Sequence, residues 1–287
     1  MRKIGPLNVS AIGIGNYLGH ADENTVKLYE ETFLKAMLSG INFFDTSINY
    51  RAMRSERNLG KAIKEALAHG VTRGQIVIST KGGYLPCEGG SYEDYIRKTF
   101  LDTGIIETKD IVAESHCITQ GFLDNQIHMS LKNLGLECID FYYLYNPETQ
   151  MLEVNEDEFY RRLGDAFNFL EEKVREEKIR SYGLATWNGF RVKKGGLDLN
   201  RIIALAQDAG GDGHHFKAIQ VPYNLVMMEI IKQDFIEKVK AHNLSLMISA
   251  PLMQGKVMQI CSRVFEELPE GKSHPTKHTQ HLSLIHI

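Results

Sequence analysis

The chain has 287 residues, of which 43% are hydrophobic and 24% are charged, and its formal net charge is -3. This composition predicts a soluble globular protein with a substantial core, and the weak negative charge argues against a nucleic acid or an anionic membrane surface as a partner. No apolar run approaches the roughly 20 residues that a membrane helix needs. The four cysteines show no C-x-x-C spacing and the N-terminus has no signal-peptide pattern, so we expect a cytoplasmic protein with reduced thiols.

Short apolar runs alternate with longer amphipathic stretches along the chain, an order that predicts βαβ units around a parallel sheet. After Asn155, for example, Phe159, Leu163 and Phe167 recur at helical spacing, with Asn155 as the N-cap. Seven short runs are predicted to be strands: 9–14, 41–44, 76–80, 140–144, 181–185, 218–221 and 245–248.

The number and regular spacing of these units favour the α/β class and a (β/α)8 TIM barrel. A doubly wound open sheet is the alternative. Its fingerprint, G-x-G-x-x-G after the first strand, is matched only in part by Gly13, Gly15 and Gly19, because the third glycine comes one residue late. We therefore expect the barrel.

The last part of the chain does not supply an eighth unit of the same kind. We expect residues 1–272 to form a single, incomplete barrel domain that lacks the eighth βα unit. Residues 273–287 are expected to form a disordered tail that does not look like native protein, so the natural gene product should be longer. Four of the eleven histidines fall in this tail, but their spacing matches no common set of ligands and we expect no metal site.

Three residues with complementary chemistry follow two neighbouring strands. Asp45 ends the second predicted strand, Tyr50 follows five residues later, and Lys81 ends the third. The carboxyl ends of parallel strands are where such proteins hold their ligands. A Lys81 ammonium at ~4 Å would favour the tyrosinate by roughly 4 kcal/mol at an effective dielectric constant of about 20. We therefore expect the pKa of Tyr50 to fall by around 3 units, with Asp45 holding Lys81 charged.

Each of these residues taken alone is compatible with ordinary packing, a solvated strand end or a turn. Their order and spacing, however, resemble the aldo-keto reductases in the segments FFDTSINY (43–50), SERNLG (55–60) and STK (79–81), and the resemblance extends over about residues 9–256. It implies a (β/α)8 barrel that binds NADP(H) in an extended form and reduces an aldehyde or ketone to an alcohol by hydride transfer. Tyr50 is then the proton donor, Lys81 its activator and Asp45 the anchor of Lys81.

The chain departs from the family at a fourth catalytic position. The family usually has a histidine at the end of the fourth strand, where this chain has Tyr145. A phenol can donate a hydrogen bond to a substrate oxygen, but it does not titrate near neutral pH as an imidazole does. His116, which precedes the helix near residue 122, is either a substitute for the missing histidine or a structural residue.

The resemblance also implies cofactor contacts. Gln220 matches the glutamine that bonds to the nicotinamide carboxamide, Thr186 lies where the fifth strand supplies further contacts, and Leu252 belongs to a Pro-Leu pair after the seventh strand. Ser249 stands where a tyrosine commonly stacks on the nicotinamide ring. No version of the family's basic clamp for the 2′-phosphate is recognisable.

The sequence therefore predicts an NADPH-dependent reductase of a small carbonyl compound, without identifying the compound or the oligomeric state. Two alternatives stay open. One is a barrel that binds the cofactor with little or no turnover and acts as a sensor or binding subunit, which Tyr145 favours. The other is an incomplete gene product without a function of its own. The missing eighth unit predicts lower stability than a complete homologue and weak NADPH binding.

Overall fold

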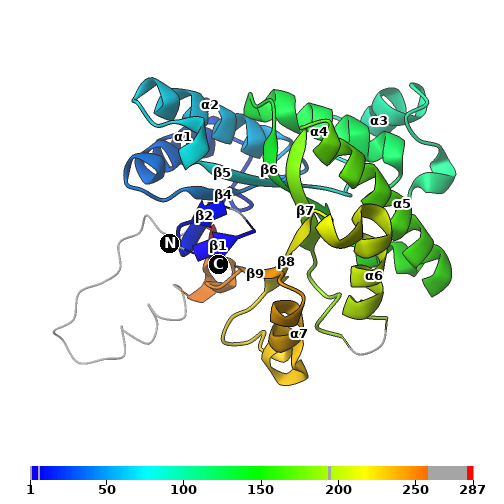
Figure 1. The fold of residues 1–287 in the computed structure, drawn as a ribbon. Coiled ribbons are helices and arrows are strands. Elements are labelled where there is room, and N and C mark those ends of the chain that lie inside the picture. The colour runs from blue at the N-terminus through cyan, green and yellow to red at the C-terminus, as the bar shows by residue number, and fades with distance from the viewer. Residues whose placement is uncertain (1, 6, 193–194, 258–282, 287) are drawn as a thin grey trace, which may run out of the picture.

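Seven parallel strands curl into a barrel with helices around its outside (Figure 1). The computed structural model of the protein describes residues 2–5, 7–192, 195–257 and 283–286. The parallel strands are β3 (Ile12–Gly15), β4 (Phe43–Asp45), β5 (Val77–Gly82), β6 (Ile139–Tyr145), β7 (Ile179–Ala185), β8 (Phe216–Pro222) and β9 (Ser245–Ser249). The prediction of an α/β barrel is confirmed, and among the described residues there is no eighth parallel strand.

Strands β4 to β8 are buried along almost their whole length, which explains why their sequences are rich in apolar residues. On the outer face, Phe44, Ile78 and Leu144 pack against the helices. The helices are α1 (Glu23–Leu38), α2 (Arg54–Ala68), α3 (Tyr92–Ile96), α4 (Gln120–Leu134), α5 (Glu156–Arg175), α6 (Leu199–Gly210) and α7 (Phe235–Ala241). Short helical turns are η1 (Arg73–Gln75), η2 (Arg97–Leu101), η3 (Thr108–Asp110), η4 (Pro147–Leu152), η5 (Gly211–Gly213), η6 (Glu229–Gln233) and η7 (Met253–Gly255).

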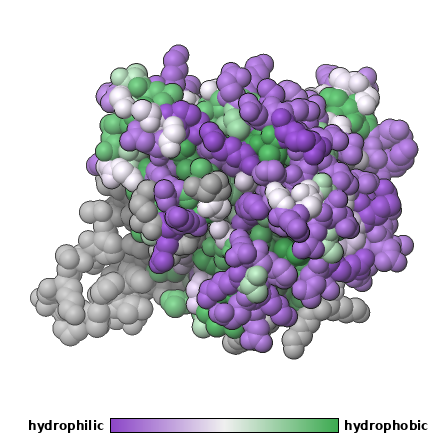
Figure 2. All heavy atoms as spheres, in the orientation of Figure 1, coloured by the Kyte–Doolittle hydropathy of each residue, from purple (hydrophilic) through white to green (hydrophobic). Residues whose placement is uncertain are grey.

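The helices carry the end signals that the sequence predicts. Asn155 caps α5, where its side chain accepts a hydrogen bond from the Glu158 backbone N–H at 2.9 Å. The face drawn in Figure 2 is mostly hydrophilic, with hydrophobic residues scattered between. In the part of the chain that the structure describes, no helix is long and apolar enough to cross a bilayer.

The barrel interior has its own apolar core, which an N-terminal hairpin helps to fill. Strands β1 (Arg2–Ile4) and β2 (Leu7–Val9) pair antiparallel, and their buried Ile4 and Val9 join Phe43, Val77 and Met247 inside the barrel. This hairpin was not predicted. The expected strand 9–14 is instead divided between β2 and β3.

The division has a local cause in the side chain of Asn42. Its carbonyl oxygen accepts a hydrogen bond from the Ser10 backbone N–H at 2.6 Å, and its amide donates to the Asn8 carbonyl at 2.9 Å. The backbone around Ser10 therefore bonds to a side chain rather than to a neighbouring strand, so the extended run breaks there. Apolar periodicity alone does not reveal such a contact.

The eighth position of the barrel is filled by β10 (Ser283–His286), which pairs antiparallel with β3 from Ser283–Gly15 to His286–Ile12 and meets β9 at Ile248. The sequence predicts a disordered tail over residues 273–287, whereas residues 283–286 form the strand β10. Backbone groups on the open edges of β3 and β9 favour pairing with any extended segment that reaches them, and four residues are too few to show a period. The predicted domain boundary at residue 272 and the tail segment 273–282 lie outside the described residues.

Candidate active site

The carboxyl ends of the strands surround a cavity of about 230 Å³. Asp45 ends β4, Lys81 lies one residue before the end of β5, and Tyr145 ends β6. A small cavity at this end of a parallel barrel is the expected place for a ligand. Its walls include Asn16, Tyr17, Asp45, Tyr50, Tyr145, Asn146, Thr186, Trp187, Gln220, Ser249 and Gln254.

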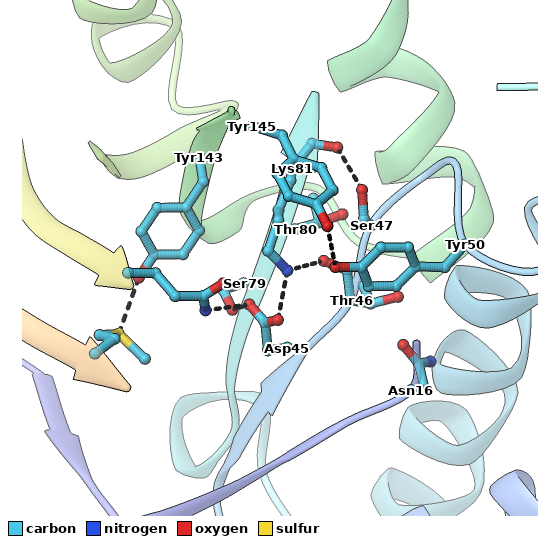
Figure 3. Close-up of polar contacts among 12 residues, drawn as sticks. Asn16, Asp45, Thr46, Ser47, Tyr50, Ser79, Thr80, Lys81, Tyr143 and Tyr145 are labelled. Atoms are coloured by element: carbon cyan, nitrogen blue, oxygen red, sulfur yellow. Dashed lines mark hydrogen bonds and ion pairs between the residues drawn. The ribbon is translucent and has the colours of Figure 1, made fainter. Parts of the chain in front are cut away.

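Asp45 and Lys81 form a buried ion pair beneath this cavity, with side chains that are 5% and 1% exposed. The Lys81 ammonium also donates to the Thr46 carbonyl oxygen at 2.8 Å (Figure 3). The second carboxylate oxygen of Asp45 accepts hydrogen bonds from the Ser79 hydroxyl at 2.5 Å and the Gln220 amide at 3.2 Å. Burial lowers the pKa of Lys81, and the charge of Asp45 opposes that shift. The pair therefore places a charged amine in a site from which water is excluded.

Tyr50 lies against this pair, within the connection from β4 to α2. Its side chain is 7% exposed, and the Lys81 nitrogen is 5.1 Å from its ring centroid. We had expected Lys81 to lower the pKa of Tyr50. The structure contradicts this, because burial, Tyr145 and the negative charge of Asp45 raise the pKa of Tyr50 well above its ordinary value. The ammonium is directed at Asp45 and Thr46 rather than at the phenol oxygen, so Tyr50 stays protonated.

Tyr145 brings a second phenol to the same wall. The Tyr50 hydroxyl donates a hydrogen bond to the Tyr145 hydroxyl at 3.2 Å, and the two rings meet edge to face with centroids 6.1 Å apart. Burial raises the pKa of Tyr145 as well. Tyr17 adds a third ring, edge-on to Tyr50 at 5.0 Å. Within the described residues, Tyr145 accepts the bond from Tyr50 and donates none, so its own proton is available to the oxygen of a bound molecule.

A left-handed turn fixes the position of Tyr50. Arg51, Ala52 and Met53 have φ angles of 51°, 54° and 61°, and α2 begins directly after them. The Arg51 guanidinium stabilises this turn by donating to the His20 carbonyl at 3.1 Å and the Asn58 side chain at 3.3 Å. Three successive residues other than glycine in this region are costly and are typical of functional sites. Nothing in the residue types signals the turn, and the sequence analysis missed it.

Comparison with known proteins shows which family the chain belongs to. The sequence model of the aldo/keto reductase family matches residues 11–267. The chain belongs to this family. The resemblance inferred from the segments around Asp45, Tyr50 and Lys81 is therefore confirmed.

Two curated relatives from Schizosaccharomyces pombe match nearly the whole chain. A "putative voltage-gated potassium channel subunit beta" is 24% identical over 274 residues, which cover 95% of this chain. The "aldo-keto reductase yakc [NADP(+)]" is 23% identical over 276 residues, which cover 94%. In both matches the chain spans 66% of the length of the relative.

Solved aldo-keto reductases share the fold. An enzyme from Klebsiella pneumoniae, solved in complex with NADP and acetate, is 18% identical with a TM-score of 0.59, and the match covers 91% of this chain and 70% of that one. An aldo-keto reductase from Bacillus halodurans, in its holo form, is 21% identical with a TM-score of 0.57 over 96% of this chain and 72% of that one.

The three residues predicted to contact the cofactor of this family differ in their placement. Gln220 and Thr186 line the cavity. The Thr186 hydroxyl, however, donates to Glu148 at 2.5 Å and accepts from the Gly189 backbone at 2.7 Å, so the protein itself uses both its hydrogen-bonding functions. Among the described residues that line the cavity, Leu252 is absent. Its role as a cofactor contact stays a prediction.

Two more residues of the cavity, Asn16 and Asn146, were missed by the sequence analysis. Asn146 and Trp187 each follow shortly after the end of a strand, and the Asn146 side chain accepts a hydrogen bond from the Trp187 backbone at 2.8 Å. Asn16 follows β3 directly and is fully buried. Asp45 was identified by the rule that residues at the carboxyl ends of strands face the site. The same rule finds Asn16, Asn146 and Trp187.

His116 does not line the cavity. Its side chain is fully buried behind β6, with Nε2 2.8 Å from the Tyr145 carbonyl oxygen. The imidazole therefore cannot touch a bound carbonyl compound. Of the two interpretations left open for His116, this position favours a structural residue.

Proposed function

We propose that this chain reduces an aldehyde or ketone to an alcohol, with NADPH as the hydride source and Tyr50 as the proton donor. The observation that carries the proposal is the pair of hydroxyls of Tyr50 and Tyr145, 3.2 Å apart on the wall of a cavity above the buried ammonium of Lys81. A carbonyl oxygen placed against both hydroxyls receives two hydrogen bonds.

The reaction needs hydrogen-bond donors beside the carbonyl oxygen. When hydride reaches the carbonyl carbon, negative charge develops on the oxygen, and a nearby donor must supply a proton. Because its pKa is raised, Tyr50 holds its proton until that charge develops. Transfer of the proton leaves a tyrosinate whose ring centroid is 5.1 Å from the Lys81 nitrogen. At an effective dielectric constant of about 20, opposite charges at about that separation attract by roughly 3 kcal/mol. Asp45 keeps Lys81 charged and oriented throughout.

Tyr145 takes the role of orienting donor in this proposal. Its hydroxyl can bond to the substrate oxygen while Tyr50 transfers the proton. Unlike an imidazole, this phenol does not titrate near neutral pH, so in this proposal Tyr145 orients the substrate while Tyr50 alone transfers the proton. We therefore propose slower turnover than a histidine in this position would allow.

The cavity residues fit the nicotinamide end of NADP(H). Gln220 and Ser249 line the cavity, and a side-chain amide and a hydroxyl are groups that can bond to a carboxamide. The cofactor would supply the hydride. Two relatives support this assignment, since one is named with NADP(+) and another was solved with NADP. A cytoplasmic protein is proposed on the same basis as in the sequence analysis.

A second candidate function is a cofactor-binding subunit with little turnover. Tyr145 in place of histidine favours it, and one relative is named as a putative channel subunit. Such a protein would bind NADPH in the same cavity and change the behaviour of a partner.

Fluorescence titration with NADPH and NADH, followed in the same cuvette by an aromatic aldehyde, separates the candidates. The reductase predicts binding and loss of reduced-nicotinamide absorbance, with the loss abolished in Tyr50→Phe. Tyr92→Phe is a matched control, because this half-buried tyrosine does not line the cavity and, among the described residues, its hydroxyl donates to the Glu114 carbonyl. Binding without turnover would select the subunit, and a Tyr50→Phe variant as active as the parent would refute the proton donor.

A further inference from the structure

A buried imidazole lies directly behind the strand that ends at Tyr145. His116 is 0% exposed and belongs to the segment between η3 and α4, where its backbone forms bridges with Tyr84 and Val112. Its Nε2 atom is 2.8 Å from the carbonyl oxygen of Tyr145. The ring therefore contacts the backbone of a residue whose hydroxyl faces the cavity.

The contacts of this imidazole define its tautomer. Burial lowers the pKa of His116 to about 4, so the ring is neutral at ordinary pH. A carbonyl oxygen can only accept, so Nε2 carries the hydrogen and donates it to Tyr145. Nδ1 is then an acceptor, and the Gln150 amide donates to it at 2.9 Å.

Gln150 is fixed in turn. It is 0% exposed, and its carbonyl oxygen accepts a hydrogen bond from the Arg162 guanidinium on α5 at 2.7 Å. The guanidinium also donates to Glu158 at 2.8 Å. Each of these hydrogen bonds can run in only one direction. The series of bonds from Glu158 to the Tyr145 carbonyl oxygen therefore has a single arrangement.

The ring of Tyr145 is held by the same cluster. The Tyr84 ring packs edge-on against His116 at 5.0 Å and against Tyr145 at 5.2 Å. Its hydroxyl accepts a hydrogen bond from the Asn146 amide at 3.0 Å. Asn146 itself has a φ angle of 44°, a conformation that needs support from its surroundings.

We propose that His116 is a positioning residue, which with Gln150 fixes the end of β6 so that the Tyr145 hydroxyl meets that of Tyr50. The inference rests on the proposed function, because the position of Tyr145 matters to turnover only if it orients a substrate. The imidazole acts through the Tyr145 backbone and never touches the substrate. A displacement of about 1 Å at a catalytic group can cost on the order of 100-fold in rate.

Two substitutions separate positioning from mere packing. His116→Gln can place an amide N–H where Nε2 lies, whereas His116→Leu fills the space without a donor. We expect His116→Leu to lower kcat roughly 10- to 100-fold with little change in NADPH affinity, and His116→Gln to recover most of that loss. Equal activity of the two variants would overturn the proposal.

A double-mutant cycle tests the route through Tyr145. If His116 acts by placing that hydroxyl, His116→Leu should cost little in a chain that already carries Tyr145→Phe. Additive losses would overturn the proposal. Should His116→Leu fail to fold, Gln150→Leu removes the donor to Nδ1 while the bond to Tyr145 is kept, and the same non-additivity with Tyr145→Phe is expected.

A readout without turnover keeps this inference separate from the proposed function. With 3-fluorotyrosine at position 145, we expect a single sharp ¹⁹F resonance in the parent and in His116→Gln, and a shifted or split one in His116→Leu. Identical spectra in all three chains would refute positioning even if the parent turns over. If the parent reduces no aldehyde but the spectra differ as expected, the reductase proposal fails and the positioning of Tyr145 stands.

Discussion

The hydroxyl of Tyr50 donates to the hydroxyl of Tyr145 at 3.2 Å, and both groups have pKa values raised by burial. A carbonyl oxygen that enters the cavity must replace Tyr145 as the acceptor of the Tyr50 hydrogen. In the proposed reduction, the two phenols would exchange one bond to each other for two bonds to a substrate. We therefore expect residue 145 to affect the rate.

The first prediction concerns that residue. Tyr145→His restores the residue type usual in the family, and we expect about tenfold higher kcat in the reductive direction, since an imidazole titrates near neutral pH. The pH profile of kcat should gain a group near about 6.5. Tyr145→Phe, which keeps the ring and loses the hydroxyl, should be slower than the parent. A Tyr145→His variant with the same kcat and pH profile as the parent would count against the proposed contact between residue 145 and the substrate oxygen.

The second prediction concerns the buried ion pair. Lys81→Met leaves the Asp45 carboxylate buried without its cation, so we expect a loss of about 3–5 kcal/mol in the free energy of unfolding, measured with urea. Adding Asp45→Asn should restore part of the stability, because the uncompensated charge is removed. Lys240→Met is the matched control, since its pair with Glu237 is 66% and 75% exposed and should be worth at most about 1 kcal/mol. Equal losses at the buried and the exposed pair would contradict this account.

The third prediction concerns the loop after β7. The Glu148 carboxylate accepts hydrogen bonds from the Thr186 hydroxyl at 2.5 Å and from the backbone of Asn188 and Gly189, each at 3.1 Å. Thr186→Val removes the hydroxyl, so we expect a loss of about 1–3 kcal/mol in stability and weaker NADPH binding as this wall of the cavity loosens. Thr186→Ser keeps the hydroxyl and should bind NADPH like the parent. Calorimetry and fluorescence titration check both variants, and unchanged binding in Thr186→Val would show that the loop does not shape the cofactor site.

The fourth prediction concerns pH. His116 has a folded pKa of about 4, below the ordinary value of 6.5, so the unfolded chain binds its proton first as pH falls. His116 therefore contributes stability that is present above pH 6.5 and is lost as the pH falls to about 4, by about 3 kcal/mol in all. His116→Gln lacks this dependence. Urea unfolding of both chains between pH 7 and 4.5 should show a smaller decrease for the variant, and parallel curves would refute the assignment.

The sequence allowed most of the barrel to be predicted, because strands buried on both faces read as apolar runs. The predicted run 140–144 lies within β6, and 218–221 lies within β8. The rule that ligands lie at strand ends brought Asp45, Tyr50 and Lys81 together as predicted, while their roles in turnover stay predictions.

What the sequence did not reveal depends on single contacts or on burial. The hairpin β1–β2 is separated from β3 by the side chain of Asn42, and the left-handed turn after Tyr50 contains no glycine. The predicted direction of the Tyr50 pKa shift was wrong, because the spacing of residues does not show how deeply a phenol is buried. The spacing of residues also does not show that the Lys81 ammonium is directed at Asp45 and the Thr46 carbonyl.

The direction of β10 makes the mouth of the barrel asymmetric. Each parallel strand delivers a loop to the catalytic rim, but β10 runs away from that rim, from its pairing with Gly15 to its pairing with Ile12. Barrels of this kind frequently bind phosphate with the loops after their last two strands. Among the described residues, the rim between β9 and β3 receives only the loop after β9. Within the described residues, a ligand on that side would therefore meet fewer loops than on the other sides of the barrel.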